Sequence, residues 1–213
     1  MSSVLDYTDK LIEYVDECRK NNIKVLKPDI NKSSAYFTSE ESGIRYGLLA
    51  IKTLGMGVIS GILKERDENG EFINLQDFCS RSAEIGVSKV SVEYLIKSGA
   101  FDGLGANRRQ MISNYEFLMD SASSFSKSNL EGQMGLFSEE NSPTAVDVEF
   151  KPEEEYRYAD LLCFEKFATG MYISGHPADP YKTALKLMHI PDALHVQSNL
   201  KEGVYSKNQV ISF

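Results

Sequence analysis

The stretch Ile51–Gly61 constrains the fold more strongly than any other part of this chain. The apolar residues Ile51 and Leu54 lead into a tight Leu-Gly-Met-Gly sequence, which begins at Leu54 and contains Gly55 and Gly57. Glycine has no Cβ, so both positions permit positive φ and a close approach of the backbone to another body. The spacing predicts two short helices joined by a tight turn, and the glycine that ends the stretch would let these helices pack closely.

This arrangement is typical of the helix-hairpin-helix motif, which grips a nucleic-acid backbone without reading its sequence. The bare N–H groups of the turn, followed by the N-terminus of a helix over 58–66, suit a phosphate. The alternative interpretation is a helix-capping glycine turn in an ordinary bundle, with charged neighbours that are merely solvated. The candidate DNA-binding residues of this first hairpin are Lys52, Leu54, Gly55, Met56, Gly57, Val58, Ser60 and Lys64.

A second, weaker unit is expected further along, where Gly99 follows a helix that ends at Ser98. Phe101 stands where the second glycine of the motif would be, so this unit is either a further DNA contact or a packing partner for the first hairpin. Another helix is predicted from Asn107 to Asp120, after a glycine-rich turn. The candidate DNA-binding residues here are Lys97, Gly99, Arg108 and Arg109.

The remaining patterns predict a mainly α-helical protein with a small β excursion near the N-terminus. An amphipathic helix is expected over about 3–21, and short strands over 23–26, 35–38 and 44–48. Asn74 is a candidate cap for a helix that joins the two hairpins. Further predicted elements are a helix over 159–172 ended by Gly175, Pro177 and Pro180, a short helix over 181–188 and a strand that begins at 204.

The serine-rich and acidic stretch from 121 to about 155 has few apolar residues, so it is predicted to be a mobile linker. Within it lies the sequence Gln133-Met134-Gly135-Leu136-Phe137. An isolated Leu-Phe pair in a polar stretch suits an apolar pocket of a partner, with the glutamine hydrogen-bonding the rim. The alternative is that the pair folds back onto the helical body of its own chain.

Composition indicates an ordinary globular protein of 213 residues with a formal net charge of −8. That charge argues against a generally basic nucleic-acid binder. The span 45–109 nevertheless carries nine basic and eight acidic residues, and the acidity gathers between 139 and 155. Three widely spaced cysteines suggest reduced thiols and a cytoplasmic location, and the sequence predicts neither a signal peptide nor a membrane span.

Catalytic and metal-binding patterns are not recognisable in the sequence. The three histidines form no ligand set with the cysteines, and no close pair of acids suits Mg²⁺ in phosphoryl transfer. His176 lies near Ser174 but lacks a third orienting group, so a local hydrogen bond at a helix end is the preferred interpretation. No Walker-type or dinucleotide-binding loop is present, and no catalytic or metal site is predicted.

Several motifs, in order along the chain, resemble the alpha subunit of bacterial DNA polymerase III, the replicative C-family DNA polymerase. They cover nearly the whole chain, and the resemblance implies a segment from the C-terminal half of that subunit. The motifs that carry the resemblance are Asp6–Lys10, Tyr14–Arg19, Val25–Asn31, Ile44–Gly61, Leu95–Asp102, Gly132–Phe137 and Tyr172–Pro177.

The resemblance also implies an organisation into five parts. They are the end of the fingers region at 1–42, a tandem helix-hairpin-helix domain at 43–120, a flexible acidic linker at 121–157, a helical connector at 158–203 and the start of a truncated OB-fold at 204–213. The family's catalytic aspartates lie in a palm domain outside this segment. The segment is therefore expected to be inactive alone and to hold no cofactor, with Mg²⁺ required only in the absent palm.

By the same resemblance, Gln133, Met134, Gly135, Leu136 and Phe137 are the contact with the sliding clamp. Gly135 departs from the polar residue that many members carry there, which adds flexibility and would weaken binding.

The implied role is to bind the duplex DNA backbone and to tether a replicative polymerase to its clamp during DNA replication. The implied partners are double-stranded DNA, the sliding clamp and other polymerase III holoenzyme subunits, without a membrane. Two alternatives remain open: a helical protein–protein adaptor, and a fragment of a DNA repair protein that shares the hairpin.

Overall fold

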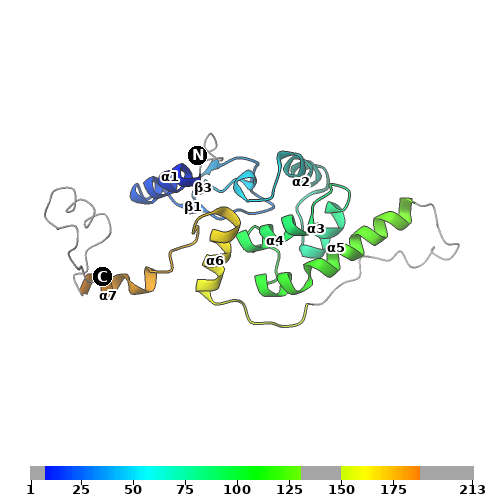
Figure 1. Ribbon diagram of the computed structural model, residues 1–213. Helices are drawn as coiled ribbons and strands as arrows, with labels where there is room; N and C mark the ends of the chain where they lie inside the picture. Colours follow the sequence, from blue (N-terminus) through cyan, green and yellow to red (C-terminus); the bar gives the residue numbers. More distant parts are fainter. Residues whose placement is uncertain (1–7, 131–149, 188–213) are drawn as a thin grey trace. The chain divides into compact units, whose positions relative to one another are not determined.

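The computed structural model describes residues 8–130 and 150–187 (Figure 1). The chain divides into two units, residues 1–174 and 175–213, and each is described separately. The predicted clamp-binding residues 133–137 and the strand expected from 204 both lie outside the described residues. Within the described part, no helix is long and apolar enough to cross a membrane.

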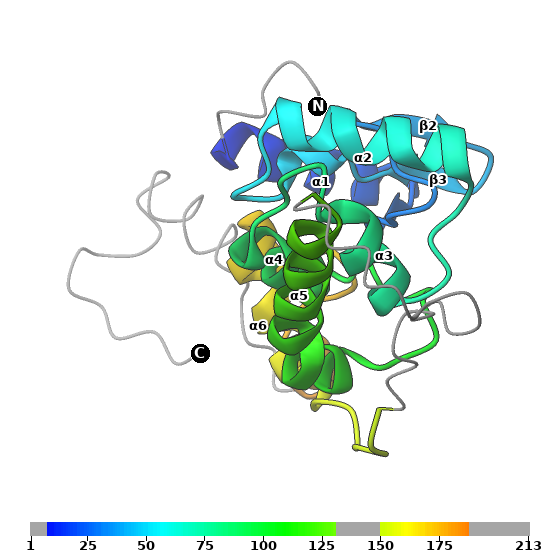
Figure 2. The same cartoon turned by 90° about the vertical axis from the view of Figure 1, so that its right-hand side faces the viewer.

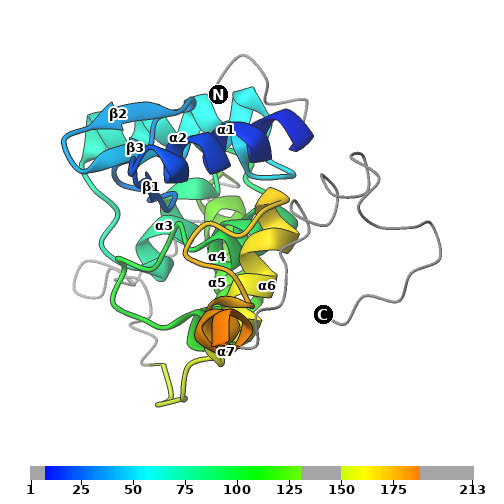
Figure 3. The ribbon, with the colours of Figure 1, turned by 90° about the vertical axis from the view of Figure 1, so that its left-hand side faces the viewer.

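The N-terminal part of the first unit is a helix followed by a three-stranded sheet. Helix α1 (Thr8–Lys20) lies within the predicted span, and it buries Leu11 and Val15. The sheet has the order β1-β3-β2, with β1 (Val25–Leu26) parallel to β3 (Gly43–Arg45) and β2 (Thr38–Glu40) antiparallel to it. The sheet lies beside α1 and α2 (Figure 3). The β excursion is thus confirmed.

The bounds of β2 and β3 differ from those of the strands predicted at 35–38 and 44–48. Residues 35–37 instead cross over Gly47, where an added Cβ would lie 2.5 Å from the carbonyl carbon of Tyr36. This crossing is held by hydrogen bonds from the N–H groups of Leu48 and Leu49 to the carbonyls of Ser34 and Ala35. Because the backbone groups of Ser34 and Ala35 pair with Leu48 and Leu49 in this crossing, the β2–β3 strand pairing is confined to residues 38–40 and 43–45, next to the turn.

The rest of the first unit is helical. A 3₁₀ turn, η2 (Leu48–Ala50), precedes α2 (Met56–Asn69), which lies across one end of the other helices (Figure 2). Those helices are α3 (Leu75–Ser82), α4 (Lys89–Ser98), α5 (Arg108–Leu130) and α6 (Tyr158–Thr169). Helix α4 packs against both α5 and α6, and α3 packs against α5. The predicted mainly α fold is confirmed.

Local capping explains where most of these helices begin and end. The side chain of Asn74 accepts a hydrogen bond from the N–H of Asp77 and caps α3, as predicted. Ser88 caps α4 in the same way, and Gly99 ends it with a φ of 84° in the left-handed region. Gly170 ends α6 with a φ of 86°, so the predicted end of that helix near residue 172 was slightly late.

The helix after the second hairpin is longer than predicted. It was expected to end at Asp120, where the serine-rich stretch begins, yet α5 continues to Leu130. The hydroxyls of Ser123 and Ser124 donate to the carbonyls of Met119 and Asp120, one turn earlier, so these serines are compatible with a helix. The predicted linker over 121–130 was therefore wrong about local structure.

A cluster of aromatic rings forms the centre of the helical core. The ring of Phe78 in α3 lies 5.0 Å from that of Phe72 and 4.8 Å from that of Phe101, measured between centroids. Phe101 is 1% exposed, so the residue that replaces the second glycine of the motif is a core residue. Its ring contact is with Phe78 in α3, the helix that joins the two hairpins.

The second unit contributes two short elements to the described residues, η3 (Asp179–Tyr181) and α7 (Lys182–Leu187). The N–H of His176 donates to Asp179 Oδ2 at 2.6 Å, and His176 Nδ1 accepts from the N–H of Ala178 at 3.1 Å. The histidine therefore makes local hydrogen bonds as predicted, but at the start of a helical turn and not at a helix end.

Candidate nucleic-acid interface

The turn of the first hairpin is anchored by its two apolar residues. Ile51 is 1% exposed and Leu54 is 5% exposed, and both belong to the core. Leu54 is thus a support for the turn, and its side chain does not reach the surface. The helix expected before the turn is only the 3₁₀ turn η2, and the helix after it begins at Met56 rather than Val58.

Neither glycine of this turn has the positive φ that the sequence suggested. Thr53 takes the left-handed conformation with a φ of 71°, whereas Gly55 has a φ of −87° and Gly57 lies inside the first turn of α2. A Cβ added at Gly55 or Gly57 would meet no described atom within 4 Å. Because both glycines are exposed, they leave the surface around the helix start bare.

The N-terminus of α2 is open to an anion. Gly55 provides no side-chain cap, and the first turn of α2 contains no acidic residue. The first N–H groups of a helix lack partners within the helix, and the helix dipole places partial positive charge there. Met56 is 40% exposed and flanks this end. Such an end can bind a phosphate through backbone N–H groups alone.

Two lysines lie on the surface of the first hairpin. The Nζ of Lys52 donates to the carbonyl of Phe167 at 3.0 Å, and its backbone N–H donates to Ala168. The side chain of Lys64 is 72% exposed and lies 3.9 Å from Glu68. Ser60 is also exposed, and Val58 is half-buried.

Gly61 allows a close approach, but the partner differs from the predicted one. An added Cβ would collide with Cγ2 of Ile85, a residue that follows α3. The short element before the turn is therefore not the surface against which Gly61 packs.

The second hairpin has a longer turn than the sequence indicated. It runs from Gly99, which ends α4, to Asn107, after which α5 begins. Gly105 has a φ of 83° two residues before Asn107, as Thr53 has a φ of 71° two residues before Gly55. Residues 105–107 are thus the structural counterpart of the first turn, and Gly99 is not.

Asn107 and Gln110 cap α5 reciprocally. Asn107 Oδ1 accepts from the N–H of Gln110 at 2.9 Å, and Gln110 Oε1 accepts from the N–H of Asn107 at 3.1 Å. This pattern resembles a capping box, in which two side chains satisfy each other's backbone N–H groups. The helix start predicted at Asn107 is thus correct to within one residue, and the Asn-x-x-Gln spacing is a local signal for it.

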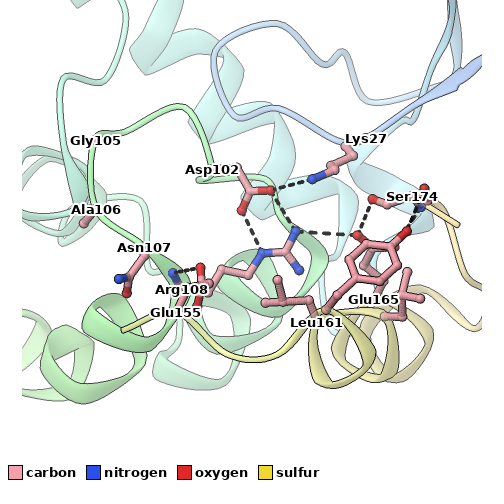
Figure 4. Close-up of a pocket in the computed structure, with 12 residues that line it drawn as sticks. Lys27, Asp102, Gly105, Ala106, Asn107, Arg108, Glu155, Leu161, Glu165 and Ser174 are labelled. Carbon is pink, nitrogen blue, oxygen red and sulfur yellow. Dashed lines mark hydrogen bonds and ion pairs between the residues drawn. The ribbon is translucent and has the colours of Figure 1, made fainter. Parts of the chain in front are cut away.

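Arg108 is buried beneath the second hairpin (Figure 4). Its guanidinium donates to both carboxylate oxygens of Asp102, at 2.7 and 2.8 Å, and to the carbonyl of Lys97 at 3.1 Å. Glu165, which is 1% exposed, lies 3.6 Å from it and also accepts from two backbone N–H groups and from the hydroxyl of Ser174. Arg108 is therefore a structural ion-pair partner.

Comparisons with known proteins agree with this geometry. The family model described as "Helix-hairpin-helix motif" matches residues 22–111, a span that holds the first hairpin and the turn of the second. DNA polymerase III subunit alpha of Borreliella burgdorferi is 39% identical over 215 residues, which cover 100% of this chain and 18% of that protein.

Other relatives carry the same name. The protein of Bacillus subtilis is 34% identical over 201 residues, covering 94% of this chain and 18% of the relative. The protein of Deinococcus radiodurans is 40% identical over 182 residues, which cover 82% of this chain and 13% of the relative. The chain belongs to the DNA polymerase III alpha subunit family. It spans less than a fifth of the length of these relatives.

In this alpha-subunit segment, the other predicted contacts of the second hairpin are engaged within the chain. Lys97 forms an ion pair with Glu93 at 2.5 Å, and its Nζ lies 4.6 Å from the centre of the Phe167 ring. Arg109 is half-exposed and lies 3.5 Å from Glu153. Gly99 is buried, and an added Cβ would collide with Arg108.

A pocket of about 400 Å³ adjoins the buried arginine. Figure 4 shows its charged groups directed toward one another: Lys27 lies 3.0 Å from Asp102, which in turn binds Arg108. Its charges are thus matched by internal partners. Among the residues that the structure describes, no group of three His, Cys, Asp or Glu side chains could hold a metal ion.

Proposed function

We propose that this segment binds the backbone of duplex DNA, without sequence preference, through the first hairpin. The observation that carries the proposal is the open N-terminus of α2, where Gly55 and Gly57 leave bare N–H groups exposed and no acid stands in the first turn. Lys52 and Lys64 would add positive charge beside the phosphate. In the whole alpha subunit, this contact would hold duplex DNA during replication.

The acidic net charge is compatible with this role. A contact of one helix end and two lysines involves few phosphates, so its affinity is modest and falls with salt less steeply than that of a protein with many phosphate contacts. The segment would bind DNA that the polymerase has already captured, so it need not bind tightly alone. The catalytic step and its Mg²⁺ belong to the palm domain outside the segment, and the cytoplasm is the proposed location.

A Gly57→Val exchange tests the DNA contact. Valine would fill the bare surface at the helix start, while the helix itself should tolerate it because glycine is the poorer helix former. We expect wild-type protein to bind a fluorescent duplex with salt-dependent affinity, and the variant to bind at least about ten-fold more weakly, a loss of about 1.4 kcal/mol.

The matched control is Gly103→Val, at another glycine with open surroundings in the described part of the chain. It should retain wild-type affinity. Equal affinity of Gly57→Val and wild type would refute the hairpin contact and favour the adaptor alternative.

We also propose that residues 133–137 bind the sliding clamp. The proposal is supported by the sequence Gln133–Phe137 and by the family to which the chain belongs. Changing Leu136 and Phe137 to alanine together should abolish binding to the cognate clamp in a pull-down or interferometry assay, because hot-spot apolar anchors carry most of the energy of such contacts. The neighbouring double change Glu139→Ala with Glu140→Ala should retain it, and retained binding by the first variant would remove the clamp proposal.

A further inference from the structure

Residues 150–157, here called the strap, lie against the start of α5. Phe150 packs against the hydrophobic core at one end of the strap. Gln110 Nε2 donates to the carbonyl of Lys151 at 2.9 Å, and Asn107 Nδ2 donates to the carbonyl of Glu153 at 2.6 Å. The same side chains that cap α5 therefore also hold the strap.

Arg109 adds two further contacts to the strap. Its guanidinium lies 3.5 Å from the carboxylate of Glu153 and 5.4 Å from the centre of the Tyr156 ring. Ser113 also donates to Glu153 at 3.4 Å. The hydrogen bonds and ion pairs of the strap all involve the first two turns of α5 or its cap, and the ring of Tyr156 also packs 4.9 Å from that of Phe164 in α6.

The carboxylate of Glu155 occupies the N-terminus of α5. Glu155 Oε2 accepts from the N–H of Arg108 at 2.8 Å, and Oε1 accepts from the N–H of Arg109 at 3.2 Å. Figure 4 shows Glu155 beside Arg108 and Asn107 at this end. A carboxylate in this place interacts with the same N–H groups and helix dipole that would bind a phosphate.

The two hairpins therefore differ at equivalent places. In the first, the N-terminus of α2 follows Gly55 and is open. In the second, the N-terminus of α5 is filled by an anion from a part of the chain 46 residues away. Glu155 itself is exposed, so its carboxylate can exchange with a competing anion without disturbing the core.

We propose that the strap is a latch that closes the second hairpin to DNA. While Glu155 stays in place, only the first hairpin is open to a phosphate; release of the strap uncovers the N–H groups of Arg108 and Arg109. Release also removes Glu153 from the side chain of Arg109, which then becomes available to the same phosphate. The inference rests on the proposed DNA-binding function and adds an autoinhibitory contact to it.

Two neighbouring glutamates provide a matched test in the 213-residue chain. Glu155→Ala removes the latch, and Glu154→Ala removes an equal charge from the adjacent exposed position. Without DNA, amide hydrogen exchange at Arg108 and Arg109 should speed up in Glu155→Ala and stay at the wild-type rate in Glu154→Ala. Unchanged exchange in both variants would show that no latch is present.

Duplex titration over a range of salt concentrations then tests the consequence. Glu155→Ala should bind about five-fold more tightly than Glu154→Ala, in the range of a helix-terminus interaction. Its salt slope should steepen by about 0.9, the value for one additional phosphate. Equal affinities and slopes for the two variants would overturn the proposal, even where hydrogen exchange had changed.

Adding Gly57→Val to each variant separates this inference from the proposed function. A gain from Glu155→Ala that persists with Gly57→Val supports the latch whether or not the first hairpin binds DNA. If Gly57→Val weakens the wild type but Glu155→Ala gives no gain over Glu154→Ala, the first-hairpin contact stands and the latch is refuted.

Discussion

Arg108 binds both carboxylate oxygens of Asp102, with Nε 2.7 Å from Oδ1 and Nη2 2.8 Å from Oδ2. The two residues stand six positions apart within the second hairpin, and the arginine side chain is 4% exposed. A planar guanidinium that binds a carboxylate through two parallel hydrogen bonds has a fixed geometry. Arg108, which the sequence predicted to contact DNA, thus stabilises the turn of the second hairpin through a buried ion pair.

Replacing this arginine should destabilise the fold. Arg108→Met would leave the buried carboxylate of Glu165 without its cationic partner and Asp102 with Lys27 alone, and breaking a buried pair in this way costs about 3 kcal/mol. Urea denaturation followed by circular dichroism measures the loss. Arg109→Met, at the neighbouring half-exposed arginine, should cost less than about 1 kcal/mol. Similar losses in the two variants would contradict the structural role of Arg108.

The same ion pair predicts a dependence of stability on pH. Burial of the Asp102 carboxyl opposes its ionisation, but the hydrogen bonds and charge of Arg108, with a smaller contribution from Lys27, outweigh burial and lower the pKa of Asp102. A carboxyl whose pKa is lower in the folded state stabilises the fold above its unfolded pKa of about 3.9. This stabilisation is lost as the pH falls below that value and through the folded pKa.

Denaturation between about pH 6 and pH 2 measures this dependence. Asp102→Asn should lose the part of the acid-induced fall in unfolding free energy that comes from this carboxyl. In the Arg108→Met background, the same exchange should alter the pH profile less, because the main partner that lowers the pKa of Asp102 is gone and Lys27 alone remains. A full wild-type slope in Asp102→Asn would show that another group is responsible.

Glycine is required at one end of the second hairpin but not in its middle. Gly99 has a φ of 84°, and an added Cβ would collide with the guanidinium of Arg108. Gly99→Ala should therefore lower the unfolding free energy by at least about 1–2 kcal/mol, the cost of the left-handed conformation alone. Gly103 has open surroundings, so Gly103→Ala should change stability by less than about 0.5 kcal/mol. Thermal denaturation of both variants gives the comparison.

Local signals in the sequence predicted much of the fold correctly. The cap Asn74 and the terminal Gly99 act over a few residues, so their effects can be read from short patterns. The strand bounds were shifted because they depend on the crossing of residues 35–37 over Gly47, a tertiary contact. The extension of α5 to Leu130 was missed because serine-rich composition was taken as a sign of a linker.

For the candidate site, the sequence predicted the exposed residues of the first hairpin better than those of the second. Gly55, Gly57 and Lys64 are exposed as expected, since the motif itself places them at a helix start or on its surface. Charge in a sequence does not reveal burial, so Arg108 was assigned to DNA although it lies inside. The contact of Glu155 with α5 joins residues 46 and 47 positions apart, and no short pattern could have predicted it.

Two lysines test which charges of this segment face DNA. Lys64 is 72% exposed on α2, whereas the side chain of Lys97 is 18% exposed and lies between Glu93 and the ring of Phe167. Lys64→Ala should weaken duplex binding several-fold and reduce the salt slope by about 0.9, with little change in stability. Both substitutions remove one positive charge, so the general electrostatic effect of charge loss is matched.

Lys97→Ala should show the opposite pattern. It should lower the unfolding free energy by about 1 kcal/mol, because an ion pair within α4 and a contact with an aromatic ring are lost together. Its duplex affinity and salt slope should stay near wild-type values, measured by fluorescence anisotropy at two or more salt concentrations. If Lys97→Ala weakened DNA binding as much as Lys64→Ala, DNA would have to displace Glu93 from Lys97, and the interface would extend beyond the first hairpin onto α4 and α6.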